Sequence, residues 1–112
     1  MIARRGEVWL VDLNPIAGHE QGGRRPALVL SVDAFNASRA DLVTVLPITS
    51  RARALRSRVA VQPPEGGLSS PSYIIAEQVR TISTSRLEQR LGRVSKETLS
   101  QVCGIVSPLL GL

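Results

Sequence analysis

Several residue types on which common protein chemistry depends are almost missing from this 112-residue chain. It has one cysteine, Cys103, so neither an internal disulfide nor a zinc site made of four cysteines can form. Its one histidine, His19, argues equally against a histidine-rich metal site. Its nine acidic residues are scattered singly, unlike the clustered carboxylates of a two-metal site. We therefore expect no metal and no cofactor.

Long apolar runs and nucleotide-binding motifs are missing as well. The longest uncharged stretch, residues 98–112, is shorter than the roughly 20 residues that a membrane-spanning helix needs. The first residues lack the apolar core of a signal peptide. Neither GxGxxG nor GxxxxGK[ST] occurs in the sequence. These absences predict a cytoplasmic protein without a membrane segment.

The charge that is present comes mostly from arginine. The net charge is +5, and Lys96 is the only lysine. Guanidinium groups bind phosphate oxygens through paired hydrogen bonds, so the excess of arginine fits a nucleic-acid partner. A GC-rich coding bias produces the same excess, and composition alone does not separate these two explanations.

The apolar pattern predicts a mainly β protein that ends in a helix. We expect strands at residues 7–13, 26–32, 42–50, 58–63, 73–82 and 87–94, the last of them weaker, and a short helical turn or loop at 33–41. Residues 26–32 form a nearly continuous apolar run, which indicates a strand buried on both faces. Pro47 indicates a sheet edge or a bulge.

The C-terminal segment has the apolar stripe of a helix that packs on one side. Ser95 is the expected N-cap, and Pro108 should kink or end the helix near its last turn. Cys103 lies on the stripe and is interpreted as a small core residue. With 112 residues there is room for one domain, residues 1–112, built as a small, strongly bent antiparallel sheet or barrel closed by this helix.

The stretch GHEQGGRRPALVLS, residues 18–31, combines groups that can act on a phosphate. RNA cleavage by the substrate's own 2′-hydroxyl requires only a base, a positive clamp and a donor for the leaving oxygen. Glu20 is a candidate base, and Arg25 is fixed in an extended conformation because Pro26 follows it. Gly22 and Gly23 would let backbone N–H groups approach the phosphate. Taken alone, the stretch is also compatible with a solvated hairpin loop.

Four segments together resemble one known family. RRGEVWLVDLNPIAGHEQGGRRPALVLS, VTVLPITS, YIIAEQVRTIS and LGRVS before a terminal helix resemble, in the same order, the MazF/PemK family of toxin endoribonucleases. The resemblance implies an SH3-like, strongly curved antiparallel β-barrel of the MazF/CcdB type with a C-terminal helix, assembled as a homodimer. It implies the toxin of a type II toxin–antitoxin system that is inhibited by a cognate MazE-like antitoxin. The implied activity is metal-independent, sequence-specific cleavage of single-stranded RNA or mRNA, leaving a 2′,3′-cyclic phosphate and a 5′-hydroxyl.

The resemblance also assigns roles to individual residues. It implies that Arg25 and Thr49 are the catalytic pair. Because arginine holds its proton tightly at neutral pH, we assign Arg25 mainly to transition-state charge, with proton delivery to the leaving oxygen as a second role. Thr49 is expected to hydrogen-bond a non-bridging phosphate oxygen. The acid of its motif falls on Glu20, which we expect to act as the base, with His19 as the alternative. The glutamine of its AEQVRTI segment falls on Gln78, a substrate or structural contact.

Further arginines are expected to contact RNA. Arg24, beside the fixed arginine, is an expected phosphate contact. The segment RARALRSR, residues 51–58, begins with Arg51 and carries four arginines without an acid. It either widens the RNA-binding surface or is a solvated loop.

Two other functions compete with the enzyme. A toxin of the same barrel type that poisons DNA gyrase would depend on C-terminal residues and would need no catalytic pair. A silent RNA-binding module would need no base. The joint presence of Glu20, Arg25 and Thr49 favours the endoribonuclease.

Overall fold

The computed structural model describes residues 2–112. Seven strands are formed in this part of the chain: β1 (Glu7–Asp12), β2 (Arg24–Val29), β3 (Leu42–Thr49), β4 (Arg58–Val61), β5 (Ser72–Ile75), β6 (Arg80–Ser83) and β7 (Leu87–Arg93). The helices are α1 (Asp33–Asn36) and α2 (Lys96–Leu109). Three short 3-10 turns complete the chain: η1 (Glu65–Gly67), η2 (Ala76–Gln78) and η3 (Thr84–Arg86).

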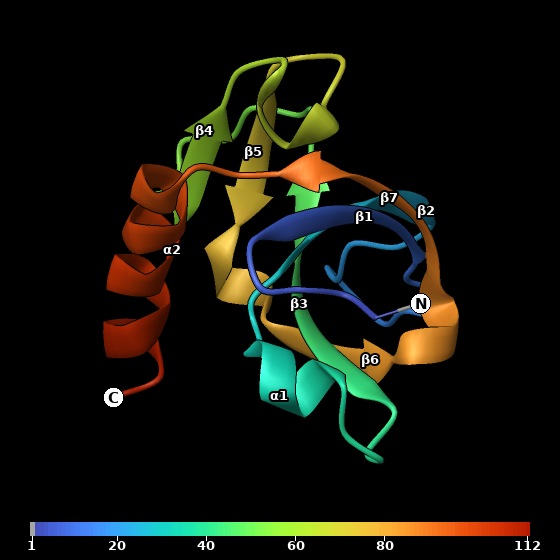
Figure 1. Cartoon of the computed structure of the whole chain (residues 1–112). Coiled ribbons are helices and arrows are strands. Elements are labelled where there is room, and N and C mark those ends of the chain that lie inside the picture. The colour runs from blue at the N-terminus through green and yellow to red at the C-terminus, as the bar shows by residue number, and fades with distance from the viewer. Residues whose placement is uncertain (1) are drawn as a thin grey trace.

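All strand pairings are antiparallel, and the sheet follows the order β4-β5-β3-β2-β1-β7, with β6 also paired to β3. The sheet is strongly bent: β1 and β7 curve round one side, while β4 lies beside α2 with β5 next to β4 (Figure 1). The expected mainly β fold with a C-terminal helix is confirmed. Within residues 2–112 no ladder joins β4 to β7, so backbone hydrogen bonds do not close this sheet into a barrel.

The core consists of two apolar clusters, one on each face of the central strands. Leu28 of β2 packs in a cluster with Val102 and Val106 of α2. Its neighbours Ala27 and Val29 belong to the other cluster. Since side chains alternate between the faces of a strand, this confirms the expectation that this run is buried on both sides. The strand itself is shifted, because it begins at Arg24 and ends at Val29.

The strand expected at residues 73–82 is interrupted, and this expectation was wrong. η2 separates β5 from β6, so β3 pairs with β6 over residues 42–45 and with β5 only at residues 48–49. Pro47 lies in the gap between these two ladders. Because proline has no N–H to donate, a continuous partner strand would lack one ladder hydrogen bond at this position. The partner strand is broken at this position, so no ladder hydrogen bond to Pro47 is required. The break raises the number of strands from the expected five or six to seven.

The capping of α2 agrees with the sequence. The Ser95 hydroxyl accepts a hydrogen bond from the Thr98 amide at 3.1 Å, as an N-cap should. Glu65 of η1 accepts from the Ser95 amide at 2.9 Å and from the Thr98 hydroxyl at 2.6 Å. The helix ends one residue after Pro108, as expected. These contacts tie η1 to the start of α2.

The apolar stripe of α2 is shorter than expected. Leu109 and Leu110 are exposed. Cys103 is only partly buried, and its Sγ atom accepts a hydrogen bond from Arg5 Nη2 at 3.1 Å. Cys103 is therefore a partly exposed contact of the N-terminal segment and not a core residue.

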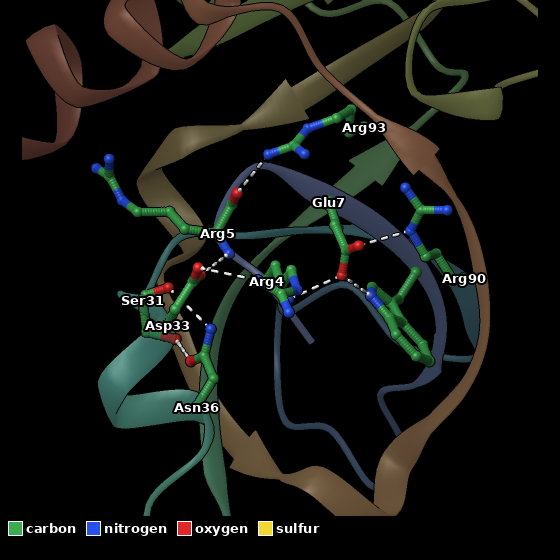
Figure 2. Close-up of polar contacts among 9 residues, drawn as sticks. Arg4, Arg5, Glu7, Ser31, Asp33, Asn36, Arg90 and Arg93 are labelled. Carbon is green, nitrogen blue, oxygen red and sulfur yellow. Dashed lines mark hydrogen bonds and ion pairs between the residues drawn. The ribbon is translucent and has the colours of Figure 1, made fainter. Parts of the chain in front are cut away.

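A buried carboxylate holds the beginning of β1. Glu7 is 5% exposed and accepts hydrogen bonds from the Arg4 amide at 2.8 Å, the Trp9 indole at 3.0 Å and Arg90 Nε at 2.6 Å. Figure 2 shows Arg90 of β7 reaching this carboxylate, next to a second group of contacts that joins Arg5 to Asp33. Trp9 is buried in this way within the sheet, which agrees with a packing role.

The pKa of Glu7 is lowered by this environment. Burial alone would raise it, but the hydrogen bonds from Trp9, Arg4 and Arg90 outweigh burial and lower the pKa below its ordinary value of 4.5. A carboxylate whose pKa is lower in the folded than in the unfolded chain stabilises the fold above pH 4.5. That contribution is lost as the pH falls through the folded-state pKa.

We expect Glu7→Ala to lower the free energy of unfolding at pH 7 by about 2–4 kcal/mol, because the buried Trp9 indole and its neighbours lose their acceptor. The loss should shrink as the pH is lowered from 5 to 3, measured by urea unfolding followed by Trp9 fluorescence. The control is Glu97→Ala, at an exposed position in the first turn of α2, which should cost less than about 1 kcal/mol. Equal losses in the two variants would contradict a structural role for the Glu7 network.

Candidate functional site

The register between β2 and β3 brings the two expected catalytic residues together. The ladder pairs Ala27 with Pro47 and Leu28 with Leu46. Continued by two residues, it places Arg25 opposite Thr49 at the end of both strands. Arg25 and Thr49 line the same cavity, whose volume is about 650 Å³.

The walls of this cavity come from several parts of the chain. Besides β2 and β3, the segment after η1 contributes hydroxyl groups, and the loop before β2 contributes one glutamine. The lining residues are Gln21, Arg24, Arg25, Pro26, Ile48, Thr49, Ser50, Arg51, Leu68, Ser69, Ser70 and Ser72. Three of them are arginines and none is an acid, so the cavity is suited to an anion.

Close contact between η1 and β7 fixes the wall that carries these serines. A Cβ atom built on Gly67 would lie 1.9 Å from the Leu91 carbonyl oxygen, and the φ of Gly67 is +69°. A Cβ atom on Gly92 would lie 2.6 Å from the Gly67 amide nitrogen. Only glycine fits at either position. The sequence alone did not assign Ser69, Ser70 or Ser72 to a site.

Arg25 is the most strongly constrained cation of the cavity. It is half-buried, and its Nε atom donates to the Gly22 carbonyl oxygen at 2.8 Å. Burial, and then the positive charge of Arg51, lower the pKa of Arg25 from its ordinary value. Arginine nevertheless remains a cation at neutral pH. Since no acid pairs with Arg25 among residues 2–112, a bound anion would relieve both the burial and the repulsion.

Thr49 presents a hydroxyl that is still able to donate. The residue is buried, and its Oγ1 atom accepts a hydrogen bond from the Arg51 amide at 3.2 Å. That contact uses a lone pair of the oxygen and leaves the hydroxyl proton for another acceptor. Arg25 and Thr49 therefore offer one charged and one neutral donor to the same anion.

Arg24 lines the cavity but already has a partner. It donates to Glu88 Oε1 of β7 from Nε at 2.8 Å, and its Nη2 lies 2.6 Å from the same oxygen. An exposed ion pair of this kind is weak, so a phosphate can compete for the guanidinium. The side chain of Arg51 has no hydrogen-bond or ion-pair partner in residues 2–112, so a phosphate would displace no acid there.

The remaining expected site residues do not line this cavity. His19 and Glu20 belong to the loop at residues 14–23, and Gln78 contacts that loop from η2. Glu20 and Gln78 line a second, smaller cavity of about 230 Å³, and Gln21 lines both cavities. The Glu20 carboxylate accepts a hydrogen bond from the Ala17 amide at 3.0 Å. His19 is exposed and lines neither cavity; its carbonyl oxygen accepts from Gln78 Nε2 at 3.3 Å.

The two glycines of this loop serve its conformation. Gly23 has a φ of +76°, a conformation that favours glycine, and its amide donates to Asn14 Oδ1 at 3.0 Å. A Cβ atom on Gly22 would lie 2.9 Å from the same Asn14 oxygen. Gly22 also supplies the carbonyl oxygen that holds Arg25. Neither glycine is among the residues that line the two cavities.

Side chains from the second half of the chain hold this loop. Gln78 Oε1 accepts from the Gln21 amide at 2.8 Å. Arg80 donates to the Leu13 carbonyl at 2.7 Å, and Arg86 donates to the carbonyls of Asp12 and Asn14. These contacts could not be predicted from the sequence, because the residues that they join are at least 57 positions apart.

Two further findings concern what the described residues do not contain. Among residues 2–112 no group of three or more His, Cys, Asp or Glu side chains is placed to hold a metal ion. Within the same range, no helix is both long and apolar enough to cross a membrane.

The fold and the cavity together define a small, mainly β protein with a basic cavity at the ends of two central strands. Comparison with known proteins identifies its family. Residues 4–110 match the model of the PemK-like, MazF-like toxins of type II toxin–antitoxin systems, and the chain belongs to this family.

The relatives give the same result. The chain is 41% identical over 104 residues to endoribonuclease MazF9 of Mycobacterium tuberculosis, covering 88% of each chain. It is 34% identical over 111 residues to endoribonuclease MazF of Staphylococcus saprophyticus, covering 97% of this chain and 92% of the relative. The crystal structure of MazF from Deinococcus radiodurans superimposes with a TM-score of 0.88 at 33% identity, covering 100% of this chain and 99% of that one.

We expect Gln78→Ala to loosen the loop at residues 14–23, because the Gln21 amide loses its acceptor. Hydrogen–deuterium exchange at residues 19–22 should become several-fold faster, as the loss of about 1 kcal/mol implies. Gln62→Ala, at an exposed position beyond β4, is the matched control and should leave that exchange unchanged. Unchanged exchange in Gln78→Ala would show that this residue does not order the loop.

Proposed function

We propose that this chain, a toxin of the MazF endoribonuclease family, cleaves single-stranded RNA without a metal ion, using the 2′-hydroxyl of the substrate as the nucleophile. The observation that carries this proposal is that Arg25 and Thr49 line the same basic cavity, which has no acid among its lining residues. The 2′-oxygen forms a bond to phosphorus while the bond from phosphorus to the 5′-oxygen breaks. The products are a 2′,3′-cyclic phosphate and a 5′-hydroxyl.

Arg25 is proposed to stabilise the transition state. The attack places additional negative charge on the phosphoryl oxygens, and a fixed cation in a half-buried site interacts with that charge more strongly than one in bulk water. The hydrogen bond from Nε to Gly22 limits the positions that the guanidinium can adopt. Because arginine holds its proton tightly, we assign it mainly to charge, with proton delivery to the leaving oxygen as a secondary role.

Thr49 is proposed to donate its hydroxyl proton to a non-bridging phosphate oxygen. Its position at the end of β3 and its contact with the Arg51 amide fix the oxygen. Ser69 and Ser70, which also line the cavity, offer further neutral donors to the same strand of RNA, whereas the Ser72 hydroxyl already donates to the Ser70 carbonyl at 2.9 Å.

Glu20 is proposed as the base that accepts the proton of the 2′-hydroxyl. It lines the neighbouring cavity, so this role requires the loop at residues 14–23 to shift when RNA binds. The contacts that hold the Glu20 carboxylate and the Gln21 amide are single hydrogen bonds, which a bound substrate can replace. His19, which is exposed on the same loop, is the alternative base.

A MazE-like antitoxin and a second copy of the chain are the proposed protein partners. MazE–MazF of Deinococcus radiodurans, with which the chain shares 36% identity and a TM-score of 0.81, was solved as a complex. We propose that a cognate antitoxin of this chain covers the basic cavity and so excludes RNA. Leu109, Leu110 and Leu112 at the end of α2 are exposed, which supports a homodimer that would bury apolar surface there. We place this single toxin domain in the cytoplasm.

We expect Arg25→Ala and Thr49→Ala each to lower kcat/KM about 100- to 1,000-fold, because each removes a donor to the transition state. The measurement uses labelled single-stranded RNA in EDTA, with the cleaved ends identified as 2′,3′-cyclic phosphate and 5′-hydroxyl. Arg39→Ala is the matched control, since Arg39 is exposed and lies outside both cavities.

Cleavage that survives in Arg25→Ala and Thr49→Ala, or that EDTA abolishes in the wild type, would overturn the mechanism. The same assay separates the two candidate bases. If Glu20 is the base, Glu20→Gln removes the acidic limb of the pH–rate profile and His19→Gln leaves it in place.

A further inference from the structure

The arginines of this protein differ sharply in how their charge is compensated. Within residues 2–112, four side chains pair with an acid: Arg4, Arg24, Arg58 and Arg90. Five others donate to a backbone carbonyl: Arg5, Arg25, Arg80, Arg86 and Arg93. The remaining ones have neither kind of contact: Arg39, Arg51, Arg53 and Arg56. Three of these four lie in a single loop.

That loop, residues 50–57, is here called the arginine loop. It follows Thr49 directly, and its first arginine, Arg51, lines the basic cavity. Arg53 and Arg56 are exposed. The nearest acids in the sequence are Asp41 and Glu65, and no arginine of the loop pairs with an acid within residues 2–112.

Both ends of the arginine loop are fixed. Thr49 Oγ1 accepts from the Arg51 amide at the beginning. At the other end the side chain of Arg58 is only 3% exposed and pairs with Glu77 at 3.0 Å. The Ser57 hydroxyl donates to the same Glu77 carboxylate at 2.8 Å. The acid available near this loop is thus used to anchor its end, and the positive charges between the two ends stay uncompensated.

The charge of the arginine loop adds to that of the cavity. The lowered pKa of Arg25, caused first by burial and then by Arg51, indicates that these two cations repel each other. Arg53 lies two residues beyond Arg51, a distance of at most about 7 Å along an extended chain. The unpaired positive charge therefore continues from the cavity along the loop. Such a row of charges attracts a polyanion and orders its backbone.

We propose that the arginine loop binds backbone phosphates of the RNA strand outside the cleaved dinucleotide, so that the substrate site extends from the cavity over Arg53 and Arg56. This inference rests on the proposed function. The loop contains no aromatic side chain on which a base could stack, which favours contacts with phosphates over contacts with bases. It acts on substrate binding and leaves the choice of cleavage sequence to other residues.

The test compares Arg53→Gln/Arg56→Gln with the wild type on two RNA probes, a 12-nucleotide oligonucleotide and a dinucleotide, at several salt concentrations. For the 12-mer we expect KM to rise about tenfold with kcat within twofold. The slope of the logarithm of the binding constant against the logarithm of salt should fall by about 1.4, roughly 0.7 for each lost phosphate contact with a single strand. For the dinucleotide we expect no change. Arg39→Gln, an equally unpaired and exposed arginine, is the control and should behave as the wild type.

A charge-preserving variant separates loss of charge from loss of loop structure. Arg53→Lys/Arg56→Lys should restore the wild-type slope, because the slope counts the phosphates that are neutralised and lysine neutralises a phosphate as arginine does. An unchanged slope in the glutamine variant, with cleavage intact, overturns this inference and leaves the proposed function standing. An equal loss on the dinucleotide also overturns it. If the wild type neither binds nor cleaves RNA, the proposed function fails, and this inference fails with it.

Discussion

The register between β2 and β3 is the constraint on which the site depends. It sets Arg25 opposite Thr49, and a shift by one residue would turn one of the two side chains to the other face of the sheet. The register is held because Ala27–Val29 is buried on both faces, in two separate apolar clusters. A slip would move every one of these side chains into the wrong cluster. The rigidity of the site is therefore a property of the core beneath it.

The cavity keeps its positive charge by placing the acids elsewhere. Glu7, Glu65 and Glu77 are all engaged in hydrogen bonds that lower their pKa, and all three fix structural segments around the site. Burial and the charge of Arg51 make the free state of Arg25 less favourable than it would be in water. A bound phosphate would relieve this cost, which is why the uncompensated charge favours an anionic ligand.

Local pattern was sufficient for much of the fold. The strands around residues 7–13, 26–32 and 42–50, the Ser95 cap and the stop at Pro108 follow from apolar runs, capping chemistry and proline geometry. The break of the 73–82 segment into two strands was missed, because the proline that lies opposite the break, Pro47, belongs to the partner strand. A proline in one strand predicts a break in the partner strand only once the pairing of the two strands is known.

The site likewise has parts that were expected from local motifs and parts that depend on long-range contacts. The Arg25–Thr49 pair was expected from the motifs, whereas the serine wall at residues 69–72 depends on the contact between Gly67 and Gly92, which no short-range pattern reveals. The second cavity under Glu20 likewise requires Gln78 to reach the loop from 57 residues away in the sequence. Contacts of this kind follow from the assembled fold and not from spacing along the chain.

The most direct test of the account asks whether the nucleophile belongs to the substrate. An RNA oligonucleotide is first cleaved by the wild-type protein to locate its cleavage site, and the single nucleotide that carries the attacking hydroxyl is then replaced by its 2′-deoxy form. We expect binding to stay within about twofold while cleavage at that site disappears. Continued cleavage of the 2′-deoxy substrate at the same phosphodiester would contradict it.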